Sequence, residues 1–373
     1  MARKKDDQAQ DEKPEGLAGH LWAAFKKGTL FKGNADEFNQ ELLSCGLLPM
    51  DWALGGGWIR GALAEIIGPW QTGKSLLGYL SLIAAQNRGD IAALAEAEGA
   101  YSPEFFGRIG GNAEALLLSK PETVEEFFEN LSTATDAVKK SQDNTPLVML
   151  WDSIALTGTR HLMKEGVDGS RDMTKAFQMS QGTAYTRPKV REAKMVVIAT
   201  NQLRTAIGDD NEQEAHTPGG VAWPYACSQR VELNWAGGFK GSRLFNPEDD
   251  HEVVGRWIRG KVIKNRAGPP QRQFKFPLFL EEDRPHPEFV GLRTTFGIDI
   301  PHALFCFYQS LLVGEGLEQG AALFANGGWW KWHAKVREKL GGLPESMRGK
   351  DFPQVLKDHP NLNDYSFVKG LLG

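Results

Sequence analysis

Cysteine and long hydrophobic runs are both scarce in this sequence. Three cysteines occur among the 373 residues, and Cys45, Cys227 and Cys306 stand far apart, without the short spacing of metal ligands. This excludes a disulfide scaffold, and we expect a reducing, cytoplasmic compartment in which all three pack in the core. No apolar run approaches the roughly 18 residues of a membrane span, so we expect no membrane partner.

An excess of one charge sign and internal repeats are also missing. The formal net charge of −4 argues against a protein that coats nucleic acid indiscriminately, although it leaves room for a local basic groove. The first 16 residues are charged and have no apolar centre, so we expect no signal peptide. What remains, 41% hydrophobic and 24% charged residues, is typical of a soluble globular protein.

A glycine-rich loop is the strongest motif present. Residues 68–75 fit G-x-x-x-x-G-K-[ST], residues 62–67 predict a buried strand before it, and residues 74–88 predict an amphipathic helix after it. This is the setting of the phosphate loop of nucleotide triphosphatases, in which backbone N–H groups and the helix N-terminus face phosphate oxygens. Lys74 would reach the β- and γ-phosphates and Ser75 would bind Mg²⁺. The expected nucleotide-binding residues are Gly68, Pro69, Trp70, Gln71, Thr72, Gly73, Lys74 and Ser75.

Strands and helices alternate beyond this loop. Buried strands are expected at residues 91–96, 115–119, 147–151 and 194–200, and further strands at 229–235, 256–263 and 273–279. Helices are expected at residues 104–109, 122–140 and 173–192, the last disturbed at Pro188. The pattern predicts an α/β fold with a mostly parallel sheet and helices on both faces.

Composition divides the chain into three expected regions. Residues 1–36 combine a polar tail with a short helix near residues 19–27, which packs against another subunit or, equally well, against its own domain. Residues 37–283 form the core, in which the glycines of 46–61 mark a turn before the phosphate-loop strand. Two prolines in the charged stretch 282–287 indicate a linker, and residues 284–373 form a small helical or α/β domain.

Polar residues end several of the expected strands. Asp152 closes one of them, where a second acidic residue approaches Mg²⁺. Glu98 and its rival Glu96 end the neighbouring strand, where a carboxylate would polarise the attacking water. Gln202 ends another strand and is either a γ-phosphate sensor or an ordinary strand-end polar residue.

Taken together, these motifs resemble the bacterial RecA recombinase family over roughly residues 37–280. The segments that carry the resemblance are GLLPMDWALGGGWIRGALAEIIGPWQTGKS, LAEAEGAYSPEFFGRIG, LVMLWDSIAL, ATNQLRTAIG, TPGGVAWPYACSQRVEL and GKVIKNRAGPP. The resemblance implies an ATPase with ATP and Mg²⁺ as cofactors, in which Lys74, Ser75 and Asp152 match the phosphate and magnesium residues. It also selects Glu98 over Glu96 as the catalytic glutamate.

Further roles are implied by the resemblance alone. Phe105 matches the aromatic residue that stacks on adenine, and Gln202 the glutamine that links ATP to a DNA-binding loop. Lys264 and Arg266 match a basic pair that reaches the ATP of the adjacent subunit; without the resemblance they would be read as a solvated strand face.

Two segments match DNA-binding loops, within residues 157–174 and 203–220. Ile207 matches an aliphatic wedge between bases, and Gly219 and Gly220 match a backbone contact to phosphate, which suits binding that does not read sequence. The expected DNA-contacting residues are Arg171, Met173, Arg204, Ile207, Gly219 and Gly220.

Some residues depart from the family pattern. The second loop carries four acids, Phe177 stands where the family usually has an arginine, and Pro224 where it has a lysine. Trp70 and Gln71 replace small polar residues in the phosphate loop, which puts nucleotide turnover in question. Residues 331–350 hold six Lys or Arg and two Glu, which either bind a duplex backbone or are solvated around a small tryptophan core.

The sequence therefore favours an ATP-dependent recombinase that forms helical filaments of its own copies on single-stranded DNA and exchanges strands with double-stranded DNA. Single-strand-binding and loader proteins are further candidate partners. The alternatives are a ring-shaped helicase motor, which usually brings a larger N-terminal domain, a regulator of recombinase filaments, which would tolerate loss of Lys74 or Glu98, and a RecA-like clock or signalling ATPase, which would lack Gly-flanked DNA loops.

Overall fold

A computed structural model describes residues 20, 40–141, 144–166, 174–203, 217–313, 321–326 and 329–372. The chain divides into two compact units, Met1–Glu41 and Leu42–Gly373. Nearly all described residues belong to the second unit. Of the helix expected near residues 19–27, only His20 lies within the described residues, and it is helical.

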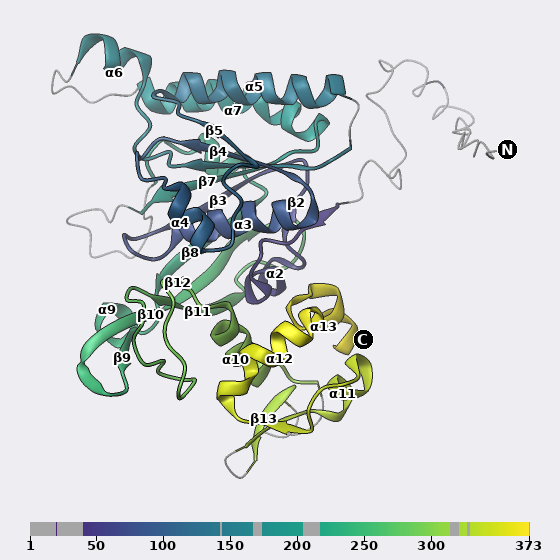
Figure 1. Cartoon of the computed structure of the whole chain (residues 1–373). Coiled ribbons are helices and arrows are strands. Elements are labelled where there is room, and N and C mark those ends of the chain that lie inside the picture. The colour runs from purple at the N-terminus through teal and green to yellow at the C-terminus, as the bar shows by residue number, and fades with distance from the viewer. Residues whose placement is uncertain are drawn as a thin grey trace. The chain divides into compact units, whose positions relative to one another are not determined.

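The second unit is built around one mixed sheet (Figure 1). Its strands run in the order β12-β11-β10-β8-β3-β7-β6-β4-β5, and β9 pairs with β10. The six strands from β8 to β5 pair in parallel, whereas β8, β10, β11 and β12 pair antiparallel. The strands are β3 (Ala62–Gly68), β4 (Ile91–Glu96), β5 (Leu116–Ser119), β6 (Leu147–Asp152), β7 (Val196–Gln202), β8 (Gln229–Trp235), β9 (Arg243–Asn246), β10 (Asp249–Asn265), β11 (Gln273–Phe279) and β12 (Gly297–Ile298).

Helices cover both faces of the parallel half, as the sequence predicts. Successive residues of β3 point to opposite faces, so Leu63 joins one hydrophobic cluster and Ala64 the other. Helices α3 (Lys74–Arg88) and α4 (Pro103–Arg108) pack on the face of Ala64, and α5 (Val124–Ser141) and α7 (Thr174–Glu192) on the face of Leu63. Figure 1 shows α5 and α7 side by side across the sheet from α3. The shorter α6 (Arg160–Glu165), α8 (Ala222–Ala226) and α9 (Gly238–Gly241) complete the core.

Two local predictions are incomplete. The glycines at 55–57 and 61 lie in turns, but the stretch 46–61 also contains the unexpected helix α2 (Leu48–Leu54), which has Pro49 in its first turn and ends at Gly55 with φ 88°. Strands β1 (Leu42–Leu43) and β2 (Trp58–Ile59) flank it. Helix α7 continues through Pro188 to its end at Glu192, so this proline, which supplies no N–H donor, does not end the helix.

The C-terminal region combines helices with a small sheet, so the α/β alternative is confirmed and the purely helical one is wrong. Its core cluster includes Phe289, Phe305, Tyr308, Trp332 and Phe352. The elements are α10 (Ile300–Ser310), β13 (Leu323–Asn326), β14 (Trp329–Trp332), α11 (Ala334–Leu340), β15 (Ser346–Met347), η2 (Gly349–Asp351), α12 (Phe352–Asp358), η3 (Pro360–Asn363) and α13 (Tyr365–Leu372).

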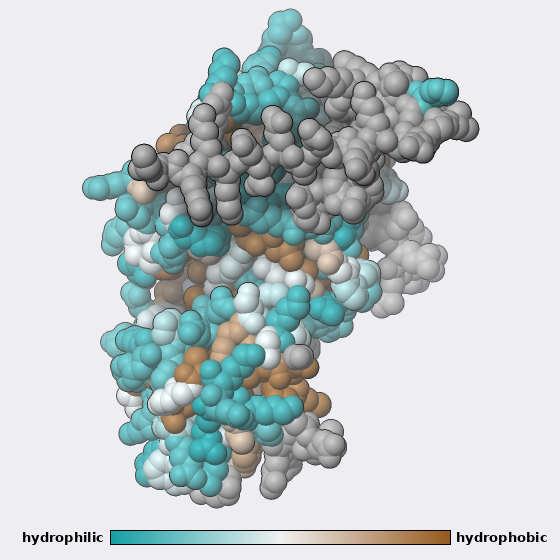
Figure 2. All heavy atoms as spheres, turned by 90° about the vertical axis from the view of Figure 1, so that its right-hand side faces the viewer, coloured by the Kyte–Doolittle hydropathy of each residue, from teal (hydrophilic) through white to brown (hydrophobic). Residues whose placement is uncertain are grey.

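Surface polarity is mixed on the side of the molecule that carries α11 and α13. Figure 2 shows hydrophobic side chains gathered among hydrophilic ones at the height of these C-terminal elements. Among the described residues, no helix is both long enough and apolar enough to cross a bilayer.

Candidate nucleotide site

The phosphate loop joins β3 to α3 in a conformation that its glycines permit. Gly73 has φ 78°, a left-handed value that favours glycine, and it begins the 15-residue helix α3 without a capping side chain. A Cβ on Gly68 would lie 2.6 Å from the Leu233 carbonyl oxygen, so no side chain fits there. The unused N–H groups at the start of α3 form a ready anion site.

Lys74 is held against its own loop. Its Nζ donates to the Pro69 carbonyl at 2.7 Å, and the Thr72 hydroxyl donates to the same oxygen at 2.9 Å. Burial lowers the pKa of Lys74, while the carboxylates of Glu98 and Asp152 raise it. The ammonium therefore lies close to both acids, and it would exchange the Pro69 carbonyl for a phosphate oxygen when a nucleotide binds.

Asp152 ends β6 and is almost fully buried. Burial raises its pKa to about 6, and hydrogen bonds from the hydroxyls of Thr200 and Ser75 oppose the rise. Ser75 thus brings its hydroxyl to the Asp152 carboxylate. The structure joins the two residues that the sequence assigns to the metal.

Glu98 and Glu96 have different surroundings. The buried Glu96 Oε1 accepts the backbone N–H groups of Glu98 at 3.0 Å and Ala100 at 2.9 Å, so it holds the turn after β4. Glu98 Oε1 instead accepts the hydroxyl of Ser153, the residue after Asp152. The carboxylate of Glu98 therefore contacts the residue that follows β6, whereas the carboxylate of Glu96 supports the backbone after β4.

The end of β7 lies beside the phosphate loop. Gln202 is exposed and pairs in register with Gly68, and the N–H of Leu203 donates to the Gly68 carbonyl at 3.3 Å. Its neighbour Asn201 is buried, and its Nδ2 donates to Glu65 Oε1 at 3.1 Å and to the Pro218 carbonyl at 3.0 Å.

Sequence reasoning did not identify the buried network around Asn201. Glu65 on β3 is fully buried and pairs with Arg230 Nε of β8 at 2.7 Å. The available signal was one acidic residue inside the apolar strand 62–67, because a buried charge needs a partner. The network joins three strands to the segment that precedes Gly219.

Only part of the expected DNA-contacting set can be located. Gly219 and Gly220 have φ values of 95° and 76°, and a Cβ on Gly219 would lie 3.1 Å from Ile154, just beyond β6. A Cβ on Gly220 would lie 3.0 Å from Ala176 of α7. These glycines therefore lie where the flanks of both expected loops meet. Arg171, Met173, Arg204 and Ile207 lie outside the described residues.

Of the basic pair, Lys264 lies on β10 and Arg266 directly follows this strand, and the hydrogen bonds of Lys264 go to α8. Lys264 Nζ donates to the carbonyls of Pro224 at 3.0 Å and Tyr225 at 2.8 Å, in helix α8. It pairs in register with Arg230 of β8, the strand between β10 and β3. Burial lowers the pKa of Lys264, and the nearby Arg266 adds to this.

Phe105 is half-buried on α4 and meets Phe296 edge to face, with ring centroids 5.6 Å apart. Phe296 is 38% exposed and comes from the segment before β12. No local pattern predicts that these two aromatic residues meet.

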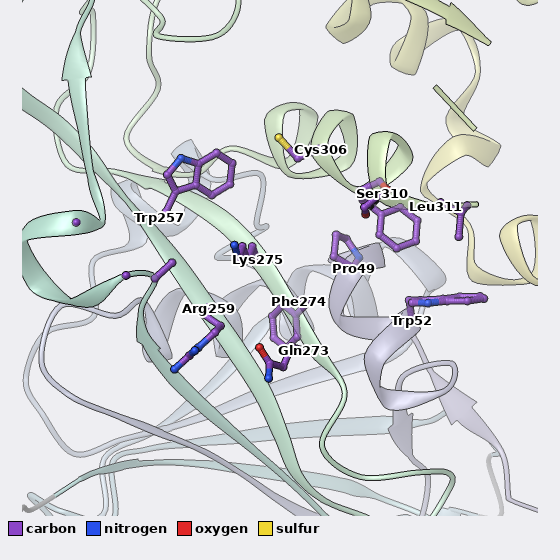
Figure 3. Close-up of a pocket in the computed structure, with 14 residues that line it drawn as sticks. Pro49, Trp52, Trp257, Arg259, Gln273, Phe274, Lys275, Cys306, Ser310 and Leu311 are labelled. Atoms are coloured by element: carbon purple, nitrogen blue, oxygen red, sulfur yellow. Dashed lines mark hydrogen bonds between the residues drawn. The ribbon is translucent and has the colours of Figure 1, made fainter. Parts of the chain in front are cut away.

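A cavity of about 920 Å³ lies elsewhere in the second unit, between α2, α10, β10 and β11. In Figure 3, Trp52 and Pro49 come from α2, Trp257 and Arg259 from β10, and Cys306 from α10. None of the sequence-predicted site residues lines it. The candidate nucleotide site is a different place, the edge of the sheet where β3, β4, β6 and β7 end around the phosphate loop.

These residues suit a nucleotide with its magnesium ion. The Ser75 hydroxyl and the Asp152 carboxylate are oxygen ligands that Mg²⁺ accepts. Among the described residues, no group of three or more His, Cys, Asp or Glu is arranged to hold a metal. Two protein oxygens are enough for Mg²⁺, which takes its other ligands from phosphates and water.

Comparison with known proteins matches most of the chain. Residues 19–283 match the family described as the RecA N-terminal domain. The chain is 29% identical over 356 residues to Protein RecA of Methylobacterium radiotolerans, covering 94% of this chain and 93% of that protein. It is 31% identical to Protein RecA of Agrobacterium fabrum over 308 residues, covering 82% and 81%. The identity to Protein RecA of Pseudomonas syringae is also 31%, over 326 residues, covering 85% and 87%.

Proposed function

Because the chain belongs to the RecA family, we propose that it is an ATP-dependent DNA recombinase. It forms filaments on single-stranded DNA, aligns that strand with a homologous duplex and catalyses strand exchange. Family membership supports ATP hydrolysis with Mg²⁺. The observation that carries the proposal is the meeting of Lys74, Ser75, Asp152 and Glu98 at one edge of the sheet.

The chain's own residues divide the work of hydrolysis. The loop amides and Lys74 bind the phosphates, and Ser75 and Asp152 would hold a magnesium ion, which would supply positive charge beside the phosphoryl group. Glu98 orients the attacking water and accepts its proton. Phe105 stacks on the base, and Gln202 responds to the γ-phosphate.

DNA contact is assigned to the two segments that flank this edge. Gly219 and Gly220 bind DNA phosphate through their backbone, and Ile207 inserts between bases. The further DNA-contacting residues are Arg171, Met173 and Arg204. The contact between Asn201 and Pro218 supports a link between Gln202 and this segment. We propose that residues 37–283 carry these activities, that 1–36 mediate oligomerisation, and that 284–373 bind double-stranded DNA.

Electron microscopy with single-stranded DNA and a non-hydrolysable ATP analogue tests the proposal. Helical filaments are expected from the parent, and none from Lys74→Ala, whose triphosphate binding is weakened. Ile207→Ala should keep nucleotide binding and thermal stability but lose strand exchange. Closed rings would favour a helicase motor, and normal exchange by Ile207→Ala would remove the wedge.

We further propose that ATP lies between subunits, where Lys264 and Arg266 of one copy act on the nucleotide of the next. A cation supplied by a neighbour would make hydrolysis depend on assembly. Mixing Lys264→Ala/Arg266→Ala protein with Lys74→Ala protein creates some interfaces with both parts intact. DNA-stimulated hydrolysis above the sum of the two separate proteins is expected. Its absence in confirmed mixed filaments would contradict an action in trans.

A further inference from the structure

The phosphate loop has an aromatic side chain at its third position, and this ring is not isolated. Trp70 is 59% exposed, yet its ring centroid lies 5.6 Å from that of Trp235 and 5.5 Å from that of Phe239. Trp235 and Phe239 meet each other at 5.1 Å. Each of the three rings therefore contacts the other two, and we call them the aromatic triad.

The two partners of Trp70 belong to the antiparallel half of the sheet. Trp235 is the last residue of β8, and Phe239 lies in α9, which leads into the β9–β10 hairpin. The guanidinium carbon of Arg256 on β10 lies 3.8 Å from the Phe239 ring centroid, and its Nη1 donates to the Phe239 carbonyl. Phe239 is thus fixed from the hairpin side by a buried cation.

The loop around Trp70 adopts a backbone that needs support. Gln71, the next residue, has φ 54°, a left-handed value that a non-glycine side chain rarely takes. Pro69, the preceding residue, supplies the carbonyl to which Lys74 donates. A tether at Trp70 therefore acts between the strained residue and the oxygen that restrains the phosphate-binding lysine.

We propose that Trp70 is a positioning residue that fastens the phosphate loop to the β9–β10 hairpin through Phe239, and so holds the loop ready to accept a nucleotide triphosphate. The inference rests on the proposed function of this loop and adds a residue to it. Trp70 touches neither Glu98 nor Asp152 in the contacts described, so it acts on nucleotide affinity and not on the chemical step. An aromatic contact of this kind changes an equilibrium by a factor of roughly 2 to 13.

Binding of a fluorescent ATP analogue to the full chain, without DNA, tests the proposal. Trp70→Ala and Phe239→Ala should each weaken binding about tenfold, and Trp70→Phe should restore most of it. Because Phe239 acts on the loop only through the triad, the double variant should bind about as weakly as Trp70→Ala alone. In steady-state hydrolysis, KM should rise while kcat is kept. Trp329→Ala, another exposed tryptophan on β14, is the matched control and should bind as the parent does.

Three results would overturn the proposal: unchanged binding by Trp70→Ala, single effects that multiply in the double variant, or a fall in kcat at constant KM. A melting temperature close to that of the parent establishes that each variant is folded; if Trp70→Ala unfolds, Trp70→Phe and Phe239→Ala carry the test. Lys74→Ala separates this inference from the function it rests on. If Lys74→Ala binds normally, the nucleotide site itself is wrong, whereas loss in Lys74→Ala with parental binding in Trp70→Ala removes only the tether.

Discussion

The two halves of the sheet differ in what their polar residues do. In the parallel half, polar side chains gather where β4, β6 and β7 end, and they face the phosphate loop. In the antiparallel half, buried polar groups such as His286 and Asp299 bind each other and support packing against α10. Parallel strands end at one common edge, whereas antiparallel strands end alternately at opposite edges. The parallel half therefore concentrates chemistry, and the antiparallel half supplies support.

The largest expected change in stability comes from breaking the seam between the halves, by which we mean strand β8 and the ion pair that its Arg230 makes with Glu65 of β3. Strand β8 pairs in parallel with β3 and antiparallel with β10, and its Arg230 neutralises the fully buried Glu65. Arg230→Ala would leave that carboxylate without its cation, and we expect the free energy of unfolding to fall by about 3–5 kcal/mol. Chemical denaturation measures the change. The matched control is Arg293→Ala, which breaks an exposed pair with Asp283 and should leave the denaturation midpoint unchanged; an equal loss in both variants would contradict a special role for the seam.

A smaller effect is expected from titrating His302 of α10, which packs against the antiparallel half of the sheet. Burial lowers the pKa of His302 to about 4, although Asp299 raises it, and both ring nitrogens lack hydrogen-bond partners among the described residues. The unfolded chain therefore takes up a proton near pH 6.5 while the folded chain does not. His302 should cost about 3 kcal/mol of stability as the pH falls from 6.5 to 4.

The measurement is the difference between the parent and His302→Phe, which fills the space among Trp257, Phe279 and Phe289 with another ring. A difference is needed because burial raises the pKa of Asp51 and Asp152 to about 6. As the pH falls over the same interval, the folded protein takes up protons at these two carboxylates before the unfolded chain does, and this increases the free energy of unfolding. The neighbouring His286 and Glu288 remain in both proteins. Identical acid sensitivity of parent and variant would remove His302 as the cause. Nucleotide binding at pH 7.5 should be the same in both.

The smallest expected free-energy change comes from Glu98→Gln, a variant of the parallel half that should affect hydrolysis and leave stability unchanged. Glu98→Gln keeps the shape of the side chain but removes the base, so hydrolysis should fall by roughly 10²-fold, about 2.7 kcal/mol in the barrier. ATP binding and thermal stability should be retained. Glu104→Gln, on the exposed part of α4, is the control for loss of one charge. Hydrolysis at the parental rate by Glu98→Gln would direct attention to Glu96.

The strands of the parallel half could be predicted from sequence to within two residues at each end, and the main reason is burial. Strands such as Leu147–Asp152 are buried along their whole length, so they appear as short apolar runs between turn signals. Helix α2 was not predicted because it has only seven residues and adjoins a glycine cluster that is typical of a turn. Its Asp51 is held by the Ser44 hydroxyl and the Cys45 N–H, contacts that no local pattern reveals.

The candidate site was predictable only as far as its residues follow strand ends. Asp152 could be named because a polar residue after an apolar run stands out, whereas the choice of Glu98 over Glu96 needed the family resemblance. The contacts of Glu65 with Asn201 and Arg230 could not be predicted, because Asn201 lies 136 positions and Arg230 165 positions beyond Glu65 in the sequence. Likewise, Trp70 stood out as unusual, but its contacts with Trp235 and Phe239 depend on how β8 leaves the sheet. Tertiary pairing over such distances has no signature in local periodicity.

Two adjacent residues at the end of β7 also constrain how this protein can change over generations. Gln202 lies in register with the phosphate loop, and Asn201 holds the carbonyl of Pro218 at the base of the segment proposed to contact DNA. Because the two side chains of neighbouring strand residues point to opposite faces, one insertion or deletion in β7 would exchange them. A shift of this strand that moves Gln202 at the nucleotide site would therefore also move Asn201 away from the carbonyl of Pro218. Variation must instead accumulate in the loops beyond the strand.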